Sequence, residues 1–181
     1  MKHDREQVSD LIEKALKHDE GACQKILNLY KGRIFSYVYR MVGNYHDAED
    51  ITFDTFIKCF KALASFDRTK KFSTWLFTIA HNTTMDFFRK NRYEYEYFDE
   101  HHSVKDDFVE KVEEAKKMEL IERCLAELPA LDREVILLFH REEYSYQEIS
   151  EILKLPVTTI KTRLHRARKR LRVLAKKVKK R

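Results

Sequence analysis

The residues with the clearest chemistry are the cations at the end of the chain. From residue 157 onward the sequence has twelve Lys or Arg and no Asp or Glu, a formal charge of +12, whereas the whole chain of 181 residues carries +6. Ammonium and guanidinium groups bind phosphates through ion pairs and hydrogen bonds, so this segment indicates a polyanionic ligand. The alternative is a solvated, Lys-rich helix that binds nothing. The elements that hold these cations favour the first interpretation.

A long helix and the turn before it position the cations. Apolar residues recur at three- and four-residue intervals from Val157 to Val178, which predicts a helix with one apolar stripe. Upstream, Ser145 and Glu148 have the spacing of a capping box, in which each side chain binds a backbone N–H at the start of a helix. Pro156 can begin the next helix because its missing N–H is not needed there. A short helix, a tight turn and a long basic helix predict a helix-turn-helix, whose last helix enters a DNA major groove.

Apolar residues at helical spacing also predict four helices in the first half of the chain, at residues 4–18, 20–42, 46–64 and 74–92. Gly43 and Asn44 end the second of them. The helix at 46–64 differs from the others because it has two apolar stripes instead of one. Its second stripe either binds another protein or shows that the helix is central in its own bundle, and periodicity leaves both possibilities open. That second stripe consists of Phe53, Phe56, Ile57 and Phe60.

A polar loop with three cations, from Ser65 to Ser73, precedes the helix at 74–92. One face of this helix is hydrogen-bonding or cationic apart from a single Met. Such a face can follow a nucleic-acid strand, with the basic loop beside it, although an ordinary solvated helix face would have the same composition. The residues on this face are Thr78, His81, Asn82, Met85, Arg89 and Arg92.

Residues 94–114 have nine acids against two lysines, a formal net charge of −7, and no clean apolar period. This composition predicts a flexible acidic linker. Two short helices are expected after it, at about 112–127 and 131–142, separated by Pro129. The sequence therefore predicts an all-α protein of two small helical domains, at residues 1–93 and 113–181, joined by a linker at 94–112.

Several classes of function are disfavoured by what the sequence lacks. It has no nucleophile and base set, no phosphate-binding loop and no metal-ligand spacing, so we expect no enzymatic activity, no cofactor and no metal. The three cysteines are odd in number and widely separated, which favours a reducing compartment. No apolar run approaches the roughly 18 residues of a membrane span. We expect a cytoplasmic protein without membrane insertion.

Two blocks of residues carry a family pattern. The first consists of Asp47-Ala48-Glu49-Asp50-Ile51 and Phe72-Ser73-Thr74-Trp75-Leu76-Phe77-Thr78-Ile79-Ala80-His81-Asn82, with Asp86 and Arg89. The second consists of Leu128-Pro129, Arg133, Tyr144-Ser145-Tyr146-Gln147-Glu148-Ile149 and Pro156-Val157-Thr158-Thr159-Ile160-Lys161-Thr162-Arg163-Leu164-His165-Arg166-Ala167-Arg168. They resemble regions 2 and 4 of bacterial sigma factors of the extracytoplasmic-function (ECF, group 4) class, and the resemblance covers roughly residues 10 to 178. The departures from the family pattern are Phe53 and Asp54, where relatives usually have Gln and Glu, and Lys154 and Thr158, where Gly is common.

The resemblance implies a protein that binds core RNA polymerase and directs promoter-specific transcription initiation, with region 2 as a helical bundle and region 4 as the helix-turn-helix. Its implied partners are core RNA polymerase, promoter DNA and an anti-sigma factor, and we expect a monomer when it is free. The alternative is a stand-alone helix-turn-helix regulator whose N-terminal helical domain senses a signal or dimerises.

The resemblance also assigns binding residues. Asn82 matches a position that faces the DNA strand in relatives. Trp75 is a candidate wedge for DNA melting, but its place at the edge of the core face favours a packing role. On a helical wheel the outward positions of the last helix are Thr158, Thr159, Thr162, His165, Arg166 and Lys169. The early ones are expected to contact bases and phosphates, and Lys161, Arg163 and Arg168 mainly phosphates. The residues expected to bind duplex −35 DNA are Thr158, Thr159, Lys161, Thr162, Arg163, His165, Arg166, Arg168 and Lys169. Those expected to bind melted −10 DNA are Asp67, Arg68, Lys70, Lys71, Thr78, Asn82 and Arg89, and those expected to bind core polymerase are Asp47, Asp50, Phe53, Asp54, Phe56, Ile57 and Phe60.

Overall fold

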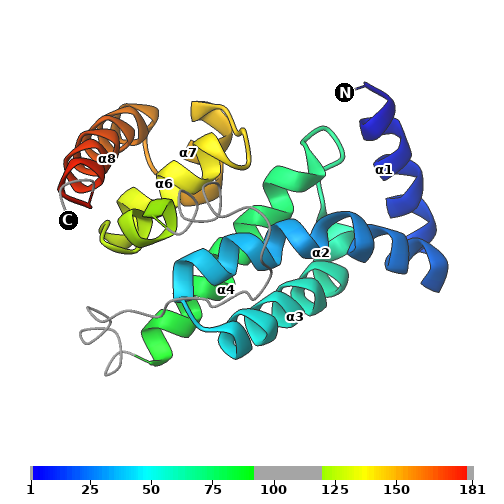
Figure 1. The fold of residues 1–181 in the computed structure, drawn as a ribbon. Helices are drawn as coiled ribbons and strands as arrows, with labels where there is room; N and C mark the ends of the chain where they lie inside the picture. Colours follow the sequence, from blue (N-terminus) through cyan, green and yellow to red (C-terminus); the bar gives the residue numbers. More distant parts are fainter. Residues whose placement is uncertain (1, 92–119, 179–181) are drawn as a thin grey trace, which may run out of the picture. The chain divides into compact units, whose positions relative to one another are not determined.

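The structure is a computed structural model that describes residues 2–91 and 120–178 (Figure 1). Every regular element in these two described ranges is a helix, which confirms the predicted all-α fold. The chain divides after Lys90 into two compact units, which are described separately below. The predicted linker at 94–112, with its histidines at 101 and 102, lies outside the described residues.

The first unit is a helical bundle arranged around its second helix. Its elements are α1 (Lys2–Ala15), α2 (Glu20–Val42), α3 (Tyr45–Ala62), the short 3-10 helix η1 (Leu63–Ser65) and α4 (Phe72–Lys90). Helix α2 packs against α1, α3 and α4, and α3 also packs against α4 (Figure 1). Because α3 touches two neighbouring helices, it needs a wider apolar surface than a helix with one neighbour. The side chains buried most completely in this unit are Tyr37, Phe77, Ile26, Ile34, Met41 and Leu76.

Short polar side chains set the ends of α2 and the start of α3. The Asp19 carboxylate accepts a hydrogen bond from the backbone N–H of Ala22 at 2.9 Å, which caps α2. Gly43 ends α2 with φ at 76°, a left-handed conformation that glycine adopts at little cost, as expected from the sequence. Asn44 then accepts from the N–H of Asp47 at 3.1 Å and caps α3. Two residues therefore suffice to turn the chain between α2 and α3.

The second unit contains the helix-turn-helix. After a helical stretch at residues 120–126 come α6 (Ala130–His140), α7 (Tyr146–Leu153) and α8 (Val157–Val178). Helix α6 packs against α8. Arg133 fixes the start of the unit, because its Nε donates to the carbonyl of Leu125 at 2.9 Å and its Nη2 to that of Leu128 at 3.2 Å. The Leu125 carbonyl lies in the last turn of that helical stretch and also accepts from the Leu128 N–H at 3.1 Å, so Arg133 adds a side-chain cap where the helix ends.

Candidate nucleic-acid interface

Local hydrogen bonds set both ends of α7, and the sequence predicts those at its start. The capping box is confirmed: the Ser145 N–H donates to the Glu148 carboxylate at 2.8 Å, and the Glu148 N–H donates to the Ser145 hydroxyl at 3.3 Å. At the other end of α7, Lys154 adopts a left-handed φ of 53°. The Ser150 hydroxyl donates to the carbonyl of Leu155 at 2.5 Å and closes the turn. These contacts fix the direction in which α8 leaves α7.

One flank of α8 is tied to α6 by a buried carboxylate. The Asp132 side chain is only 3% exposed, and its two oxygens bind different arginines of α8. Oδ1 lies 3.0 Å from Nη1 of Arg163, and Oδ2 lies 3.1 Å from Nη1 of Arg170. Both arginines stand on the same side of the helix because seven residues are nearly two full turns.

The opposite flank of α8 rests on aromatic rings. Phe139 and Tyr146 stack with their centroids 5.1 Å apart and an interplanar angle of 18°. Lys161 lies over the Tyr146 ring at 5.6 Å, and the Arg168 guanidinium lies over the Phe139 ring at 5.1 Å. Both distances are within the range of cation–π attraction. Cations on both flanks of the apolar stripe of α8 are thus held by its own unit.

Arg168 makes a second contact that depends on protonation. Its Nε donates to Nε2 of His140 at 3.1 Å, so that nitrogen must be unprotonated to accept the bond. Burial and the neighbouring Arg168 charge lower the pKa of His140 below its ordinary value. The contact is therefore kept with a neutral imidazole at neutral pH.

The strip of α8 between these flanks faces solvent. Thr158, Thr162, His165, Arg166 and Lys169 are exposed on it, and a shallow hollow lined by the three threonines of the first turns runs between Arg163 and Arg166. The Thr162 hydroxyl donates to the carbonyl of Thr158 at 2.9 Å and keeps its lone pairs for an outside donor. Thr159 is half-buried at the edge of the strip. In the described part of the chain, Arg166 and Lys169 form no ion pair.

The predicted −35 residues therefore divide into two sets in the structure. Thr158, Thr162, His165, Arg166 and Lys169 share the exposed strip, with Thr159 at its edge. Lys161, Arg163 and Arg168 lie on the flanks and contact Tyr146, Asp132, Phe139 or His140. Asp132 was not predicted as a functional residue, because it stands 31 and 38 residues from its arginines and no local pattern marks it.

In the first unit, aromatic residues anchor both ends of the basic loop. The Phe66 ring lies 5.0 Å from the ring of Trp75 and 5.4 Å from that of Phe72, and Phe72 and Trp75 are 5.7 Å apart. Trp75 is half-buried and its ring packs against both phenylalanines, which agrees with the expected packing role. Phe66 and Phe72 are buried, so the five polar residues between them form an arch closed at its base.

Within this arch the backbone and its cations are partly fixed. Asp67 accepts hydrogen bonds from the N–H of Thr69 at 2.9 Å and from its hydroxyl at 2.7 Å, and these bonds lower the pKa of Asp67. Arg68 reaches α1 and pairs with Glu13 at 2.7 Å. Lys70 and Lys71 are exposed. Two of the four −10 residues predicted here, Asp67 and Arg68, thus make contacts that hold the arch itself.

On α4, the predicted strand-binding residues lie along one face. Thr78, Asn82 and Arg89 are four and seven residues apart, which places them within about 40° of one another around the helix. Asn82 and Arg89 are exposed, and Thr78 is half-buried with its hydroxyl donating to the carbonyl of Thr74 at 2.9 Å. Residues that bind one DNA strand must lie along a common face of the helix, and these three do.

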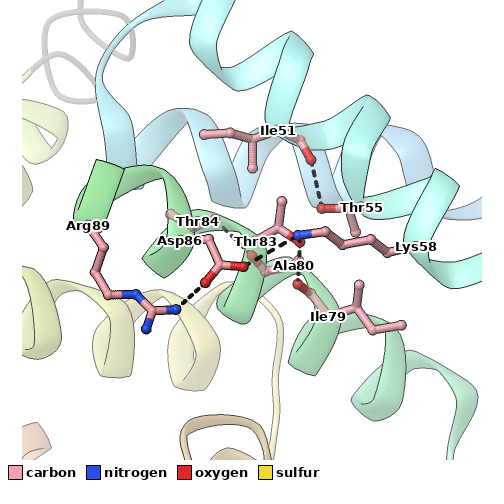
Figure 2. A network of polar contacts seen from close by, with 9 residues as sticks. All are labelled: Ile51, Thr55, Lys58, Ile79, Ala80, Thr83, Thr84, Asp86 and Arg89. Carbon is pink, nitrogen blue, oxygen red and sulfur yellow. Dashed lines mark hydrogen bonds and ion pairs between the residues drawn. The ribbon is translucent and has the colours of Figure 1, made fainter. Parts of the chain in front are cut away.

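Polar contacts join α3 to α4 behind this face (Figure 2). The hydroxyls of Thr55, Thr83 and Thr84 donate to carbonyls one turn earlier in their own helices. Lys58 of α3 crosses to α4, where its Nζ lies 3.2 Å from the Thr83 hydroxyl and 3.5 Å from the Asp86 carboxylate. Asp86 also binds Arg89. Arg89 is therefore oriented by a carboxylate that is itself held by α3.

The predicted polymerase-binding residues of α3 are only partly exposed. Phe53 is 67% exposed, the most exposed large apolar side chain in the described parts of the chain. Phe56 is 4% exposed, so its expected place on a contact surface is wrong: it belongs to the core between α3 and its neighbours. The structure exposes Asp50 and Asp54 and leaves Asp47, Ile57 and Phe60 half-buried.

The described residues contain no group of His, Cys, Asp and Glu that could hold a metal ion. None of the helices described is long and apolar enough to cross a bilayer.

A helix-turn-helix with an exposed polar strip on its last helix is the architecture of a DNA-binding protein. The pattern described as Sigma-70 region 2 matches residues 26–93, and that described as Sigma-70, region 4 matches residues 118–171. The ECF RNA polymerase sigma factor SigW of Bacillus subtilis is 39% identical over 178 residues, which cover 91% of this chain and 95% of that protein. The RNA polymerase sigma-H factor of Pseudomonas aeruginosa is 30% identical over 178 residues, covering 91% of each chain.

Solved structures agree with this assignment. The sigma factor RpoE of Bartonella quintana, in complex with the anti-sigma factor NepR, superposes with a TM-score of 0.73 at 27% identity, over 84% of this chain and 96% of that one. CnrH, in complex with the cytosolic domain of CnrY, superposes with a TM-score of 0.68 at 25% identity, over 93% and 96%. The chain belongs to the ECF sigma factors, and its function is to direct transcription initiation.

Proposed function

We propose that this sigma factor binds core RNA polymerase through α3, holds the melted −10 strand with the arch and α4, and places α8 in the major groove of the −35 element. The observation that carries the proposal is the exposed strip of α8, because its flanking cations are held by Asp132 and the aromatic pair. A helix fixed on both flanks presents one defined set of side chains to a groove.

In the proposed −35 contact, the residues at the start of the strip contact bases, and those further along α8 contact phosphates. Thr158 and Thr162 stand at the start of α8, where a recognition helix reaches base edges, and their hydroxyls and methyl groups suit such contacts. Arg166 follows on the same strip and is positioned to donate to guanine or to phosphate. His165 and Lys169 contact the phosphates of the DNA backbone. Lys161 is exposed and retains a phosphate-binding role, whereas Arg163 and Arg168 position the helix.

In the −10 contact, Asn82 and Arg89 line the path of the strand on α4, and Lys70 and Lys71 supply charge from the arch. Taking a base out of the stack costs a few kcal/mol, and contacts between that base and a preformed arch offset this cost. Arg89 binds a phosphate more favourably when Asp86 has already oriented it, because less side-chain entropy is then lost.

The polymerase contact is centred on Phe53, flanked by Asp50 and Asp54. An exposed aromatic ring with acids at its rim matches the anatomy of protein interfaces, which have an apolar anchor and a polar border. RpoE is in complex with the anti-sigma factor NepR, and CnrH is in complex with the cytosolic domain of CnrY, so we propose an anti-sigma protein as a further partner of this chain. A protein that works on core polymerase at promoters is placed in the cytoplasm, and we assign it no catalytic chemistry of its own.

In vitro transcription with purified core polymerase on a library of genomic promoters tests the proposal. Transcripts that require this protein and share −35 and −10 motifs are expected. Arg166→Ala should weaken binding to promoters that carry the −35 motif, whereas Arg172→Ala, which removes the same charge six residues further along α8, should leave that binding intact. Tight, sequence-specific duplex binding in the absence of polymerase would instead indicate a stand-alone regulator.

A further inference from the structure

Asp132 is a buried carboxylate whose presence the stability of the fold alone does not explain. It lies in the first turn of α6, it is 2% exposed, and each of its oxygens binds a different arginine. Apolar side chains of similar size hold two helices together as well as a buried ion pair does. A carboxylate that binds two arginines also fixes the orientation of α8, because each ion pair forms only when its arginine has a defined position along and around the helix.

The two arginines constrain α8 in two ways. Arg163 and Arg170 are separated by about 10 Å along the helix but lie within about 20° of each other around it. A single carboxylate can hold both only when α8 has one rotation about its axis and one position along α6. That rotation leaves Thr158, Thr162 and Arg166 on the exposed strip.

The same contacts remove two cations from the reach of DNA. Arg163 and Arg170 stand beside the strip, on the Arg166 side, where they would meet the phosphates at the groove edge if they were free. Their side chains are 36% and 54% exposed, so the ion pairs hold groups that solvent can still reach. Charge at that edge attracts any DNA sequence equally, because phosphates carry no sequence information.

We propose that Asp132 is a positioning residue for −35 recognition, which sets the rotation of α8 and keeps Arg163 and Arg170 from binding phosphates. This inference rests on the proposed role of α8 as the contact to duplex DNA. It assigns to α6 a part in promoter specificity, although α6 itself does not enter the groove.

Counterion release provides the test, since each phosphate neutralised contributes about −0.9 to the slope of log K against log salt concentration. The full chain is titrated onto a fluorescein-labelled duplex of mixed sequence at several salt concentrations, and binding is followed by anisotropy. Arg166→Gln and Lys169→Gln should each flatten the slope by about 0.9. Arg163→Gln and Arg170→Gln, which remove the same charge from the same helix, should leave it unchanged.

Asp132→Asn should act in the opposite direction. Releasing both arginines should steepen the slope by up to about 1.8, a change that a purely structural role would not produce. With core polymerase, this variant should also lose most of the preference for a promoter with its −35 element over one in which the element is replaced. Circular dichroism shows whether it folds, and if it does not, the four Gln variants decide.

The outcomes separate the two proposals. If Arg163→Gln or Arg170→Gln flattens the slope as much as Arg166→Gln does, these arginines bind phosphates and the role of Asp132 is wrong. If the wild-type chain binds the duplex but neither Arg166→Gln nor Lys169→Gln changes the slope, α8 is not the DNA contact and the proposed function itself fails.

Discussion

Lys58 in α3 and Asp86 in α4 form an ion pair, with Nζ 3.5 Å from Oδ2 (Figure 2). Because Asp86 also binds Arg89, one carboxylate connects the helix proposed to bind polymerase with a residue proposed to bind the −10 strand. Burial raises the pKa of Asp86, but the hydrogen bond from Arg89 and the charge of Lys58 lower it by more, so the pKa lies below the ordinary 3.8.

Asp86→Asn should therefore destabilise the protein in a pH-dependent way. A carboxyl whose pKa is lowered by folding contributes stability above its unfolded pKa and loses it as the pH falls through the folded pKa. Since the pair is largely solvated, we expect a loss of less than about 1 kcal/mol at pH 7 and a smaller loss at pH 3, below the unfolded pKa. Urea unfolding at both pH values measures it. Asp54→Asn, which removes an exposed carboxylate, is the control, and equal effects of the two variants would contradict the prediction.

Phe53 and Phe56 stand three residues apart on α3 and should respond to substitution in opposite ways. Phe53→Ala should change the free energy of unfolding by no more than about 0.5 kcal/mol, because the ring is exposed. It should weaken binding to core polymerase about tenfold or more, as loss of an aromatic anchor does. Phe56→Ala should cost about 3–5 kcal/mol of stability, because it leaves a cavity in the core.

Urea unfolding and a binding titration against immobilised core polymerase separate the two effects. Unchanged polymerase affinity in a folded Phe53→Ala protein would remove Phe53 from the proposed contact.

Lys154 should be replaceable by glycine with a gain in stability. Its φ of 53° is left-handed, where a Cβ atom costs roughly 1–2 kcal/mol, whereas glycine adopts this region freely. After subtraction of the extra entropy of glycine in the unfolded chain, we expect Lys154→Gly to stabilise the protein by up to about 1 kcal/mol. Thermal unfolding measures the change. Lys154→Ala keeps the Cβ atom, and a gain as large in that variant would show that backbone strain is not the cause.

Cys59 should resist modification while the protein is folded. Burial, with a smaller contribution from Cys23, raises the pKa of the Cys59 thiol to about 12, so almost no thiolate exists at pH 8. Cys23 is half-buried, and although burial and Asp19 raise its pKa too, it should react first with a disulfide reagent. In Cys23→Ser the native protein should lose the faster phase, and urea should restore rapid reaction of the remaining thiols. Fast labelling of Cys59 in the native variant would contradict the burial.

Local signals explain which parts of the fold the sequence predicts. Ser145, Glu148 and Gly43 act on neighbouring backbone groups, so their patterns are legible within four residues, and the structure confirms each of them. The helical period of the apolar residues predicts the helices for the same reason, because it too is read from residues three and four apart. It left the second stripe of α3 ambiguous, because periodicity reports that a face is apolar without reporting what covers it. The covering of Phe56 depends on α3 contacting both α2 and α4.

The organisation of the binding surfaces depends on contacts distant in sequence. Twelve cations after residue 156 predicted a polyanion site but not which of them are available to bind it. Asp132 and the Phe139–Tyr146 pair make that distinction, and each lies outside α8. The helical period of the last helix predicts its outward strip, but no pattern within a helix identifies such partners, so the sequence does not show which flanking cations are held by their own unit.

If the arch holds the melted −10 strand as proposed, its aromatic base between Phe66 and Phe72 has a consequence for the kinetics of promoter opening. Because folding closes the ends of the five-residue span, its backbone loses most of its freedom before any DNA arrives. A base that leaves the duplex then meets a rigid receptor, and its capture does not wait for the loop to find its shape. Weakening the base of the arch, as in Phe66→Ala, would slow the capture of the melted strand without touching a single DNA-facing atom.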